Sequence, residues 1–324
     1  MALSEFGLIR RYFAQGTFER DDVPLGVGDD CALLRVPVGL DLAVTMDTLV
    51  EGVHFLPGSD PEALGHKTLA VSLSDMAAMG AEPAWATLAL TLPRSDPPWL
   101  EAFSRGLAGL ARAHRVQLVG GDTTRGPVLT LTLQLQGFVA PGRALRRDGA
   151  RPGDLIAVTG TLGDAGLALR ALQGEYAAGT ALATLCARLE RPRPRVALGR
   201  ALVGLATAAI DISDGLLADL GHLCEGSGTG ATLELGSLPL APAVAAYLAR
   251  SGDWSLPLAA GDDYELCFTV PPGSQAAVER AAARCGCAVA WVGVLESEAG
   301  IRCRLPDGTL LETPEEGYEH FRQT

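Results

Sequence analysis

Aspartates stand beside glycine, serine or threonine at five separate places in this chain, and this pattern constrains how it can fold. The segments are Gly28-Asp29-Asp30, Met46-Asp47-Thr48, Ser74-Asp75, Gly120-Gly121-Asp122-Thr123-Thr124 and Asp211-Ile212-Ser213-Asp214-Gly215. Two carboxylates about 6 Å apart repel by about 3 kcal/mol at an effective dielectric constant near 20. A fold that gathers Asp30, Asp47, Asp75, Asp122 and Asp211 must therefore protonate several of them or bind divalent cations. Oxygen ligands favour Mg²⁺ over Zn²⁺, which prefers His or Cys.

Each aspartate motif taken alone also has a purely structural explanation. Asp and Ser beside glycine commonly cap helices and form turns. Asp75 before Met76, or Asp214 before Gly215, could do no more than open a helix. This explanation weakens for the five motifs together, because each aspartate follows or ends an apolar stretch. Mixed α/β folds usually assemble their sites at such points.

The chain lacks the usual glycine-rich phosphate loops. There is no G-x-x-x-x-G-K-[ST] and no G-x-G-x-x-G, and Gly65-His66-Lys67-Thr68 is only a near miss. Any nucleotide phosphates would therefore be bound mainly through metal ions held by carboxylates. The paired glycines 120–121 let the backbone approach a phosphate closely. Arg146 and Arg147 could contact phosphate in a bidentate way, although surface arginines are common.

The composition of the chain argues against some classes of binding partner. A formal charge of −12 over 324 residues argues against a nucleic-acid partner. The seven cysteines are irregularly spaced, which favours free thiols in a reducing cytoplasm. The N-terminus lacks signal-peptide features and no apolar run reaches about 18 residues, so we expect a cytoplasmic protein with no membrane partner.

Apolar periodicity predicts strands mixed with helices in both halves of the chain. Strand patterns lie at 40–45 (delivering Asp47 at its end), 85–92, 116–119 (ending at Gly120-Gly121), 128–139, 155–158, 208–212, 266–270, 289–294 and 301–305; helix patterns lie at 5–14, 61–80, 99–113, 160–172, 196–206, 215–224 and 274–285. The Pro- and Gly-containing segment 140–153 is the expected boundary. We therefore expect a mixed α/β fold with domains at 1–140 and 141–324.

In order and spacing, these motifs resemble those of the thiamine-monophosphate kinase family. The matching segments are 26–32, Asp47-Thr-Leu-Val-Glu-Gly-Val-His-Phe55, 67–83, 120–124, 149–154, 158–161, 211–216 and Asp263-Tyr-Glu-Leu266. The likeness covers about residues 4–321. That family belongs to the aminoimidazole-ribonucleotide synthetase-like superfamily of ATP-dependent enzymes.

The resemblance implies a fold, a reaction and a set of site residues. It implies two α/β domains per subunit, with N-terminal domains that pair into a β-barrel across a homodimer. It implies conversion of ATP and thiamine monophosphate to ADP and thiamine diphosphate, with several Mg²⁺ ions. The implied magnesium positions are Asp30, Thr45, Met46, Asp47, Asp75, Asp122, Asp211 and Asp214, of which Asp47, Asp75, Asp122 and Asp211 are the catalytic candidates.

Other positions match contacts to the two substrates. Gly121, Asp122, Arg146 and Ser213 match ATP contacts, and His54, Asp262 and Tyr318 match contacts to the thiamine phosphate. Two positions depart from the family pattern. Met46 stands where threonine is usual, so a ligand there must be its backbone carbonyl. Asp262 stands where many relatives carry glutamate, which shortens its reach by about one methylene.

The resemblance implies direct in-line phosphoryl transfer with no phosphoenzyme, because the acceptor phosphate is itself an anionic nucleophile. The nearest alternatives are other members of the superfamily: a purine-synthesis synthetase, a selenophosphate synthetase or a hydrogenase-maturation protein. An alternative of a different class is a non-enzymatic sensor of Mg²⁺ or nucleotide, which would form no ADP.

Overall fold

The computed structural model describes residues 5–14 and 16–311. Backbone contacts divide the chain into two units. Unit 1 comprises Met1–Met76 and Ala81–Gly142, and unit 2 comprises Ala77–Gly80 and Arg143–Thr324. Among the described residues, no helix has both the length and the apolar character needed to cross a membrane.

Unit 1 contains a four-stranded sheet in the order β1-β4-β2-β3. Its elements are α1 (Glu5–Leu8), the π-helical η1 (Ile9–Phe13), β1 (Asp41–Val50), α2 (Pro61–Ala78, which runs on into unit 2), β2 (Glu82–Leu92), α3 (Pro97–Ala113), β3 (Gln117–Arg125) and β4 (Thr130–Val139). β4 is antiparallel to both β1 and β2, and β2 is parallel to β3. β1 and β3 are therefore the two edges of the sheet.

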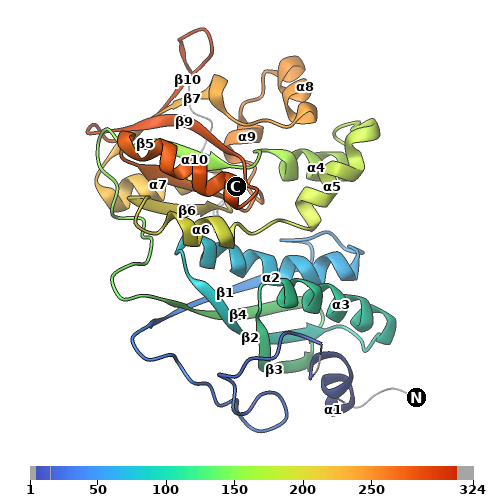
Figure 1. The fold of residues 1–324 in the computed structure, drawn as a ribbon. Helices are drawn as coiled ribbons and strands as arrows, with labels where there is room; N and C mark the ends of the chain where they lie inside the picture. The colour runs from blue at the N-terminus through green and yellow to red at the C-terminus, as the bar shows by residue number, and fades with distance from the viewer. Residues whose placement is uncertain (1–4, 15, 312–324) are drawn as a thin grey trace. The chain divides into compact units, whose positions relative to one another are not determined.

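The helices α2 and α3 lie together against one face of this sheet (Figure 1). Leu131, Leu133 and Leu135 alternate along β4 and are completely buried, as the two-residue period of a strand requires. The helices approach each other closely at Gly65 and Gly106, where an added Cβ would lie only 2.0 Å and 1.9 Å from backbone oxygens of the other helix. Small residues at this crossing are therefore required by the packing.

Unit 2 contains a seven-stranded mixed sheet in the order β11-β10-β7-β9-β5-β8-β6. Its elements are β5 (Leu155–Thr159), α4 (Asp164–Leu172), η2 (Gly179–Ala181), α5 (Leu182–Glu190), α6 (Val196–Leu202), β6 (Ala208–Ile212), α7 (Leu216–Ser227), β7 (Gly230–Glu234), η3 (Leu235–Ser237), α8 (Pro242–Ser251), α9 (Ser255–Ala259), β8 (Glu265–Val270), η4 (Pro272–Ser274), α10 (Gln275–Arg284), β9 (Val289–Glu296), β10 (Gly300–Arg304) and β11 (Leu310–Leu311). β7 and β10 pair in parallel, and the other pairs are antiparallel.

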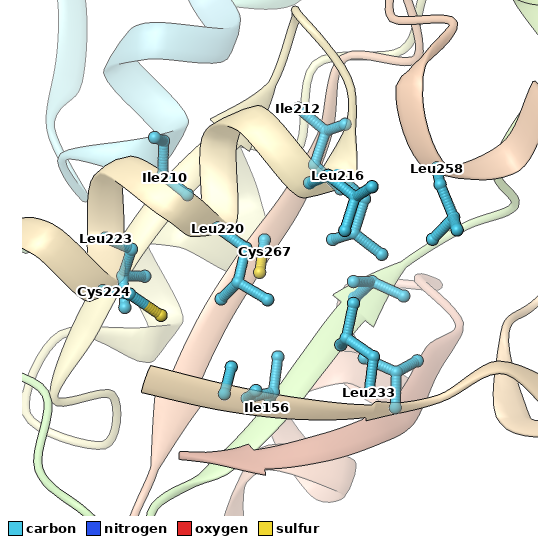
Figure 2. Packing of buried hydrophobic residues seen from close by; sticks show 14 of the residues in the cluster. Ile156, Ile210, Ile212, Leu216, Leu220, Leu223, Cys224, Leu233, Leu258 and Cys267 are labelled. Carbon is cyan, nitrogen blue, oxygen red and sulfur yellow. The ribbon is translucent and has the colours of Figure 1, made fainter. Parts of the chain in front are cut away.

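The main core of unit 2 lies between α7 and this sheet (Figure 2). Leu216, Leu220 and Leu223 recur along α7 at helical spacing and are fully buried. Ile156 of β5 and Leu233 of β7 belong to the same cluster. Each such side chain contributes roughly 2 kcal/mol of hydrophobic stabilisation, so α7 is firmly fixed on the strands that precede and follow it.

Two expectations about local structure are wrong. Asp47 lies inside β1 and not at the end of a strand, and Gly120 to Asp122 lie inside β3. Strand pairing continues through these polar residues because the ladder uses backbone groups, and the neighbouring threonines suit a strand. The segment 65–68, a near miss to the phosphate-loop motif, lies inside α2, which confirms the helix predicted at 61–80.

Candidate functional site

The first group of predicted site residues lies where β1 faces α2. Thr45 and Asp47 are two residues apart on β1 and share one face. Ser72 and Asp75 are three residues apart on α2 and share one side. The Ser72 hydroxyl donates to Asp47 Oδ2 at 2.6 Å, and the Thr45 hydroxyl donates to Asp75. Asp75 is therefore inside a helix and is not the helix cap that the structural explanation required.

The electrostatics of this group favour a bound cation. Burial, and then the negative charge of Asp75, raise the pKa of Asp47 to about 6. A divalent ion near both carboxylates would remove this cost, and the hydroxyl and carboxylate oxygens form a donor set that suits Mg²⁺. The side chain of Met46 is 64% exposed and points to the opposite face of the strand. Only its backbone carbonyl could serve as a ligand.

The second group lines a cavity of about 630 Å³ at the β3 edge of unit 1. Asp30 and Asp122 both line it, together with Gly121 and Cys31. The volume falls within the range of small-molecule sites, roughly 300–1,000 Å³. The neighbouring Asp29 accepts the backbone N–H of Asp30 at 2.8 Å, which fits its expected role as a turn residue.

Strand order separates these two groups. β1 and β3 are opposite edges of the sheet, three strand spacings or about 14 Å apart. Over residues 5–14 and 16–311, no group of three or more His, Cys, Asp or Glu side chains is close enough to hold one ion. Unit 1 therefore does not gather its four leading aspartates into a single cluster.

The third group lies in unit 2, around the loop between β6 and α7. Asp211 is the fourth residue of β6 and is 5% exposed. Ser213 and Asp214 follow in the loop and are half-buried. The carboxylate of Asp219 accepts the backbone N–H groups of both Ser213 and Asp214. Burial, and then the charge of Asp214, raise the pKa of Asp219 to about 7.

The strained turn around Asp262 and Tyr264 is hydrogen-bonded to this loop. The N–H groups of Asp262 and Tyr264 donate to the carbonyls of Ser213 and Ile212, each at 2.8 Å. Asp262 and Tyr264 have positive φ angles of 62° and 49°, which non-glycine residues rarely adopt. Such strain often persists at functional sites, where surrounding contacts hold it. The predicted nucleotide position Ser213 and the predicted substrate position Asp262 are thus hydrogen-bonded neighbours, and the predicted metal position Asp214 follows Ser213 in the chain.

Charged side chains anchor the chain that leaves this turn. Glu265 is completely buried and pairs with Arg195 through two contacts of 2.6 Å and with Arg188 through one of 2.6 Å. Asp263 is buried and accepts the N–H of Gly163. Burial, followed by nearby negative charges, raises the pKa of Asp263 well above its usual value.

His54 has a defined tautomer. Its Nδ1 accepts the backbone N–H of Val50 at 3.0 Å, so the proton of the neutral ring is on Nε2. Nε2 is therefore the donor atom of the neutral ring. Arg146 is exposed and forms a two-point ion pair with Asp148. Tyr318 lies outside the described residues.

The sequence analysis did not single out Ser72, Asp219 or the Glu265 ion-pair network. Asp219 had a usable signal: an acid in the first turn of a helix often accepts N–H groups at the start of that helix. Ser72 lay on the helical pattern three residues before Asp75, but only the pairing with β1 makes that spacing meaningful. Arg195 is 70 residues from Glu265, and no local pattern links them.

Comparison with known proteins now identifies the family. Models of the N-terminal and C-terminal domains of AIR synthase related proteins match residues 28–139 and 151–305. A thiamine-monophosphate kinase of Escherichia coli (strain K12) is 48% identical over 323 residues, which cover 99% of each chain. The chain belongs to the thiamine-monophosphate kinase family.

Solved structures of thiamine-monophosphate kinases share the fold. That from Stenotrophomonas maltophilia K279a is 46% identical, with a TM-score of 0.86, and covers 96% of this chain and 99% of its own. A structure described as AaThiL complexed with AMPPCP and TMP is 32% identical, with a TM-score of 0.78 and coverage of 91% and 92%. The mixed α/β two-domain architecture expected from the sequence is therefore confirmed.

Proposed function

We propose that this protein transfers the γ-phosphoryl group of ATP directly to the phosphate of thiamine monophosphate. The bond from the γ-phosphorus to the β–γ bridging oxygen breaks, and an acceptor phosphate oxygen forms the new bond. ADP and thiamine diphosphate are the products. The observation that carries the proposal is the 48% identity to a thiamine-monophosphate kinase over 99% of both chains.

The chemistry places limited demands on the protein. The acceptor oxygen is already anionic near neutral pH, so no strong general base is needed. Two anions must instead be held in line while charge spreads over the transferred group. The side chain of Arg146 and the N–H of His54 are cationic or donor groups suited to phosphate. Asp262 carries a charge suited to the cationic thiazolium ring of the acceptor.

Three groups of oxygen ligands support the binding of several Mg²⁺ ions. Thr45, Asp47 and Asp75 would hold one ion where β1 faces α2. Asp30 and Asp122, at the cavity, and Asp211 and Asp214, in unit 2, would provide ligands for others. Bound Mg²⁺ would neutralise phosphate charge during the transfer. The cavity with Asp122 and Gly121 is the proposed nucleotide site in unit 1.

We also propose a homodimer that pairs through β1. Leu42, Val44 and Met46 alternate along this edge strand and are 44%, 54% and 64% exposed. Val36 and Val38, just before the strand in the chain, are also exposed apolar side chains. An exposed apolar edge strand favours pairing with another strand. A second copy of unit 1 docked there would continue the sheet, which supports the barrel implied by the family.

An ADP-release assay tests the reaction. ATP and Mg²⁺ are supplied with thiamine monophosphate, with thiamine, or with an aminoimidazole precursor. We expect ADP formation only with thiamine monophosphate, in equal amount to thiamine diphosphate. If thiamine monophosphate did not stimulate ADP formation, the proposal would be wrong. If the aminoimidazole precursor stimulated it, a purine-synthesis enzyme would be favoured.

Two further results separate the remaining alternatives. Asp122→Ala should abolish ADP formation by the kinase, whereas a sensor would form no ADP even before mutation. Rapid quenching of a reaction with γ-labelled ATP should yield no labelled protein. Capture of a phosphorylated aspartate or histidine on the turnover pathway would refute direct transfer.

A further inference from the structure

Asp219 is a buried carboxylate that the proposed reaction does not use. It lies in the first turn of α7 and is 3% exposed. A buried carboxylate without partners is costly, so its hydrogen bonds indicate what it does. Its Oδ2 accepts the N–H of Ser213 at 3.0 Å and the N–H of Asp214 at 3.1 Å.

These bonds hold the loop and not the helix. α7 begins at Leu216 with Gly215 as its N-cap, and both donors precede that residue. An ordinary capping side chain would instead satisfy N–H groups within the first turn. On its other side the loop is held by the N–H of Asp262, which donates to the Ser213 carbonyl at 2.8 Å. The backbone of Ser213 is thus fixed from two directions.

The C-terminal end of α7 holds the segment around Arg146, which is the other predicted nucleotide contact of unit 2. The Ser227 hydroxyl donates to the Arg147 carbonyl at 2.7 Å and accepts the N–H of Ala150 at 3.2 Å. The carbonyl of Arg146 accepts the N–H of Ala209, on β6, at 3.0 Å. One rigid helix, packed on the core of the unit, therefore fixes the main chain beside both Ser213 and Arg146.

Satisfied N–H groups limit how the loop can meet a phosphate. Loops that cradle phosphate point several backbone N–H groups at the anion. Here Asp219 already accepts the N–H groups of Ser213 and Asp214, so these two groups do not point at a phosphate. A magnesium nucleotide must then be bound by the side chains of Ser213 and Asp214 and not by their backbone N–H groups.

We infer that Asp219 is a positioning residue, which fixes the main chain of Ser213 and Asp214 so that their side chains meet the magnesium nucleotide. The inference rests on the proposed function for the role of those two residues. Asp219 itself touches neither substrate. Without this acceptor oxygen, both N–H groups lose their partner and the loop can change its conformation. The side chains of Ser213 and Asp214 are then no longer held in position for the nucleotide.

Calorimetric titration of a non-hydrolysable ATP analogue, with Mg²⁺ and without thiamine phosphate, tests the inference on the full-length protein. Asp219→Ala should weaken analogue binding by about tenfold or more, the loss expected from two hydrogen bonds. Asp219→Asn keeps an acceptor oxygen of the same shape and should restore binding to within about threefold.

Asp154→Ala is the matched control. Asp154 is a carboxylate of the same unit, is 5% exposed, and accepts the N–H of Arg151 and the hydroxyl of Thr207. Its loss should lower the thermal midpoint as Asp219→Ala does but change analogue binding less than about twofold. Should Asp219→Ala not fold, Asp219→Glu takes its place, because it keeps the charge but displaces the oxygen; it should weaken binding about fivefold.

Wild-type affinity in Asp219→Ala, or an equal loss in Asp154→Ala, would overturn the inference. So would wild-type affinity in Asp219→Glu if the alanine variant does not fold. The proposed function is tested separately, because analogue binding requires no turnover. A wild-type protein that binds the analogue but forms no ADP with thiamine monophosphate contradicts the reaction, and the affinity ratios still decide the role of Asp219.

Discussion

Arg195 and Glu265 form a two-point ion pair in unit 2, with both contacts at 2.6 Å. Glu265 is completely buried at the beginning of β8, directly after the strained turn that carries Asp262. Arg188 and the hydroxyl of Thr159 complete its partners. These donors supply the hydrogen bonds that a carboxylate needs when it is removed from water.

Arg195→Met should therefore destabilise the protein by about 3 kcal/mol, because it leaves a buried carboxylate without its main cation. Urea unfolding measures the change. Arg304→Met is the control: Arg304 pairs with Glu234 at 2.5 Å, but both side chains are more than 40% exposed. An exposed pair contributes less than about 1 kcal/mol. Equal losses in the two variants would contradict the special role of the buried pair.

Much of the fold was predictable from the sequence because its core elements have strong local patterns. α2, α3 and β4 occur within a few residues of their predicted ranges, and β6 at its predicted range. β7 and α8 were missed. β7 has only five residues and no alternation, and its partners β9 and β10 lie more than 50 residues later in the chain. Pairing over such separations leaves no local signal.

Sequence motifs singled out candidate site residues one by one, but they did not predict how those residues are arranged. Asp47 and Asp122 were singled out from their neighbours, yet they belong to opposite edges of one sheet. Strand order is a long-range property that spacing along the chain does not encode. Asp219 was missed for a different reason: its place in the first turn of α7 is a weak signal, and that signal does not show that its partners are the N–H groups of the preceding loop.

Gly121 and its neighbour Gly120 should respond differently to alanine. Gly121 has a φ of 152°, and an added Cβ would lie 1.9 Å from the Leu88 carbonyl oxygen. At Gly120 the nearest atom would be a methyl group of Thr87 at 3.9 Å. Gly121→Ala should cost about 2 kcal/mol or more and weaken nucleotide binding, whereas Gly120→Ala should change stability by less than about 1 kcal/mol. Chemical unfolding and analogue titration measure both, and a tolerated Gly121→Ala would show that β3 is not constrained as described.

Asp263 should give the wild-type protein a stability that falls as pH rises. Burial first, and then the charges of Asp164 and Glu265, raise its pKa in the folded state. The folded state then binds more protons than the unfolded state, whose carboxyl titrates near about pH 4. The contribution is complete below that pH and is lost as pH rises towards the folded pKa, with a slope of up to about 1.4 kcal/mol per pH unit.

Asp263→Asn removes this titration and keeps an acceptor for the N–H of Gly163. The free energy of unfolding of the variant, relative to wild type, should therefore become more favourable between pH 5 and pH 7 in urea titrations, by about 1 kcal/mol or more in total. A difference between the two proteins that stays constant over this range would mean that Asp263 is not protonated in the folded state.

Val44→Glu should convert the proposed dimer to a monomer. Val44 is 54% exposed on the edge strand β1, and two copies of the new charge would face an apolar surface. Leu310→Glu is the control, because Leu310 is 61% exposed on β11 of the other unit. Sedimentation velocity should show a monomer for the first variant and a dimer for the second. A dimeric Val44→Glu protein would place the interface elsewhere.

Asp47→Asn should remove the stabilisation that Mg²⁺ gives to the wild-type protein. A ligand that binds only the folded state adds about 2.7 kcal/mol at one hundred times its dissociation constant, so the thermal midpoint should rise with added Mg²⁺. Without Mg²⁺ the variant should be at least as stable as wild type, because the repulsion between Asp47 and Asp75 is gone and the Ser72 hydroxyl keeps an acceptor.

Asp41→Asn, at an exposed position of the same strand, should respond to Mg²⁺ as wild type does. An undiminished Mg²⁺ response in Asp47→Asn would exclude Asp47 as a main ligand and move the ion to the carboxylates of the cavity or of unit 2.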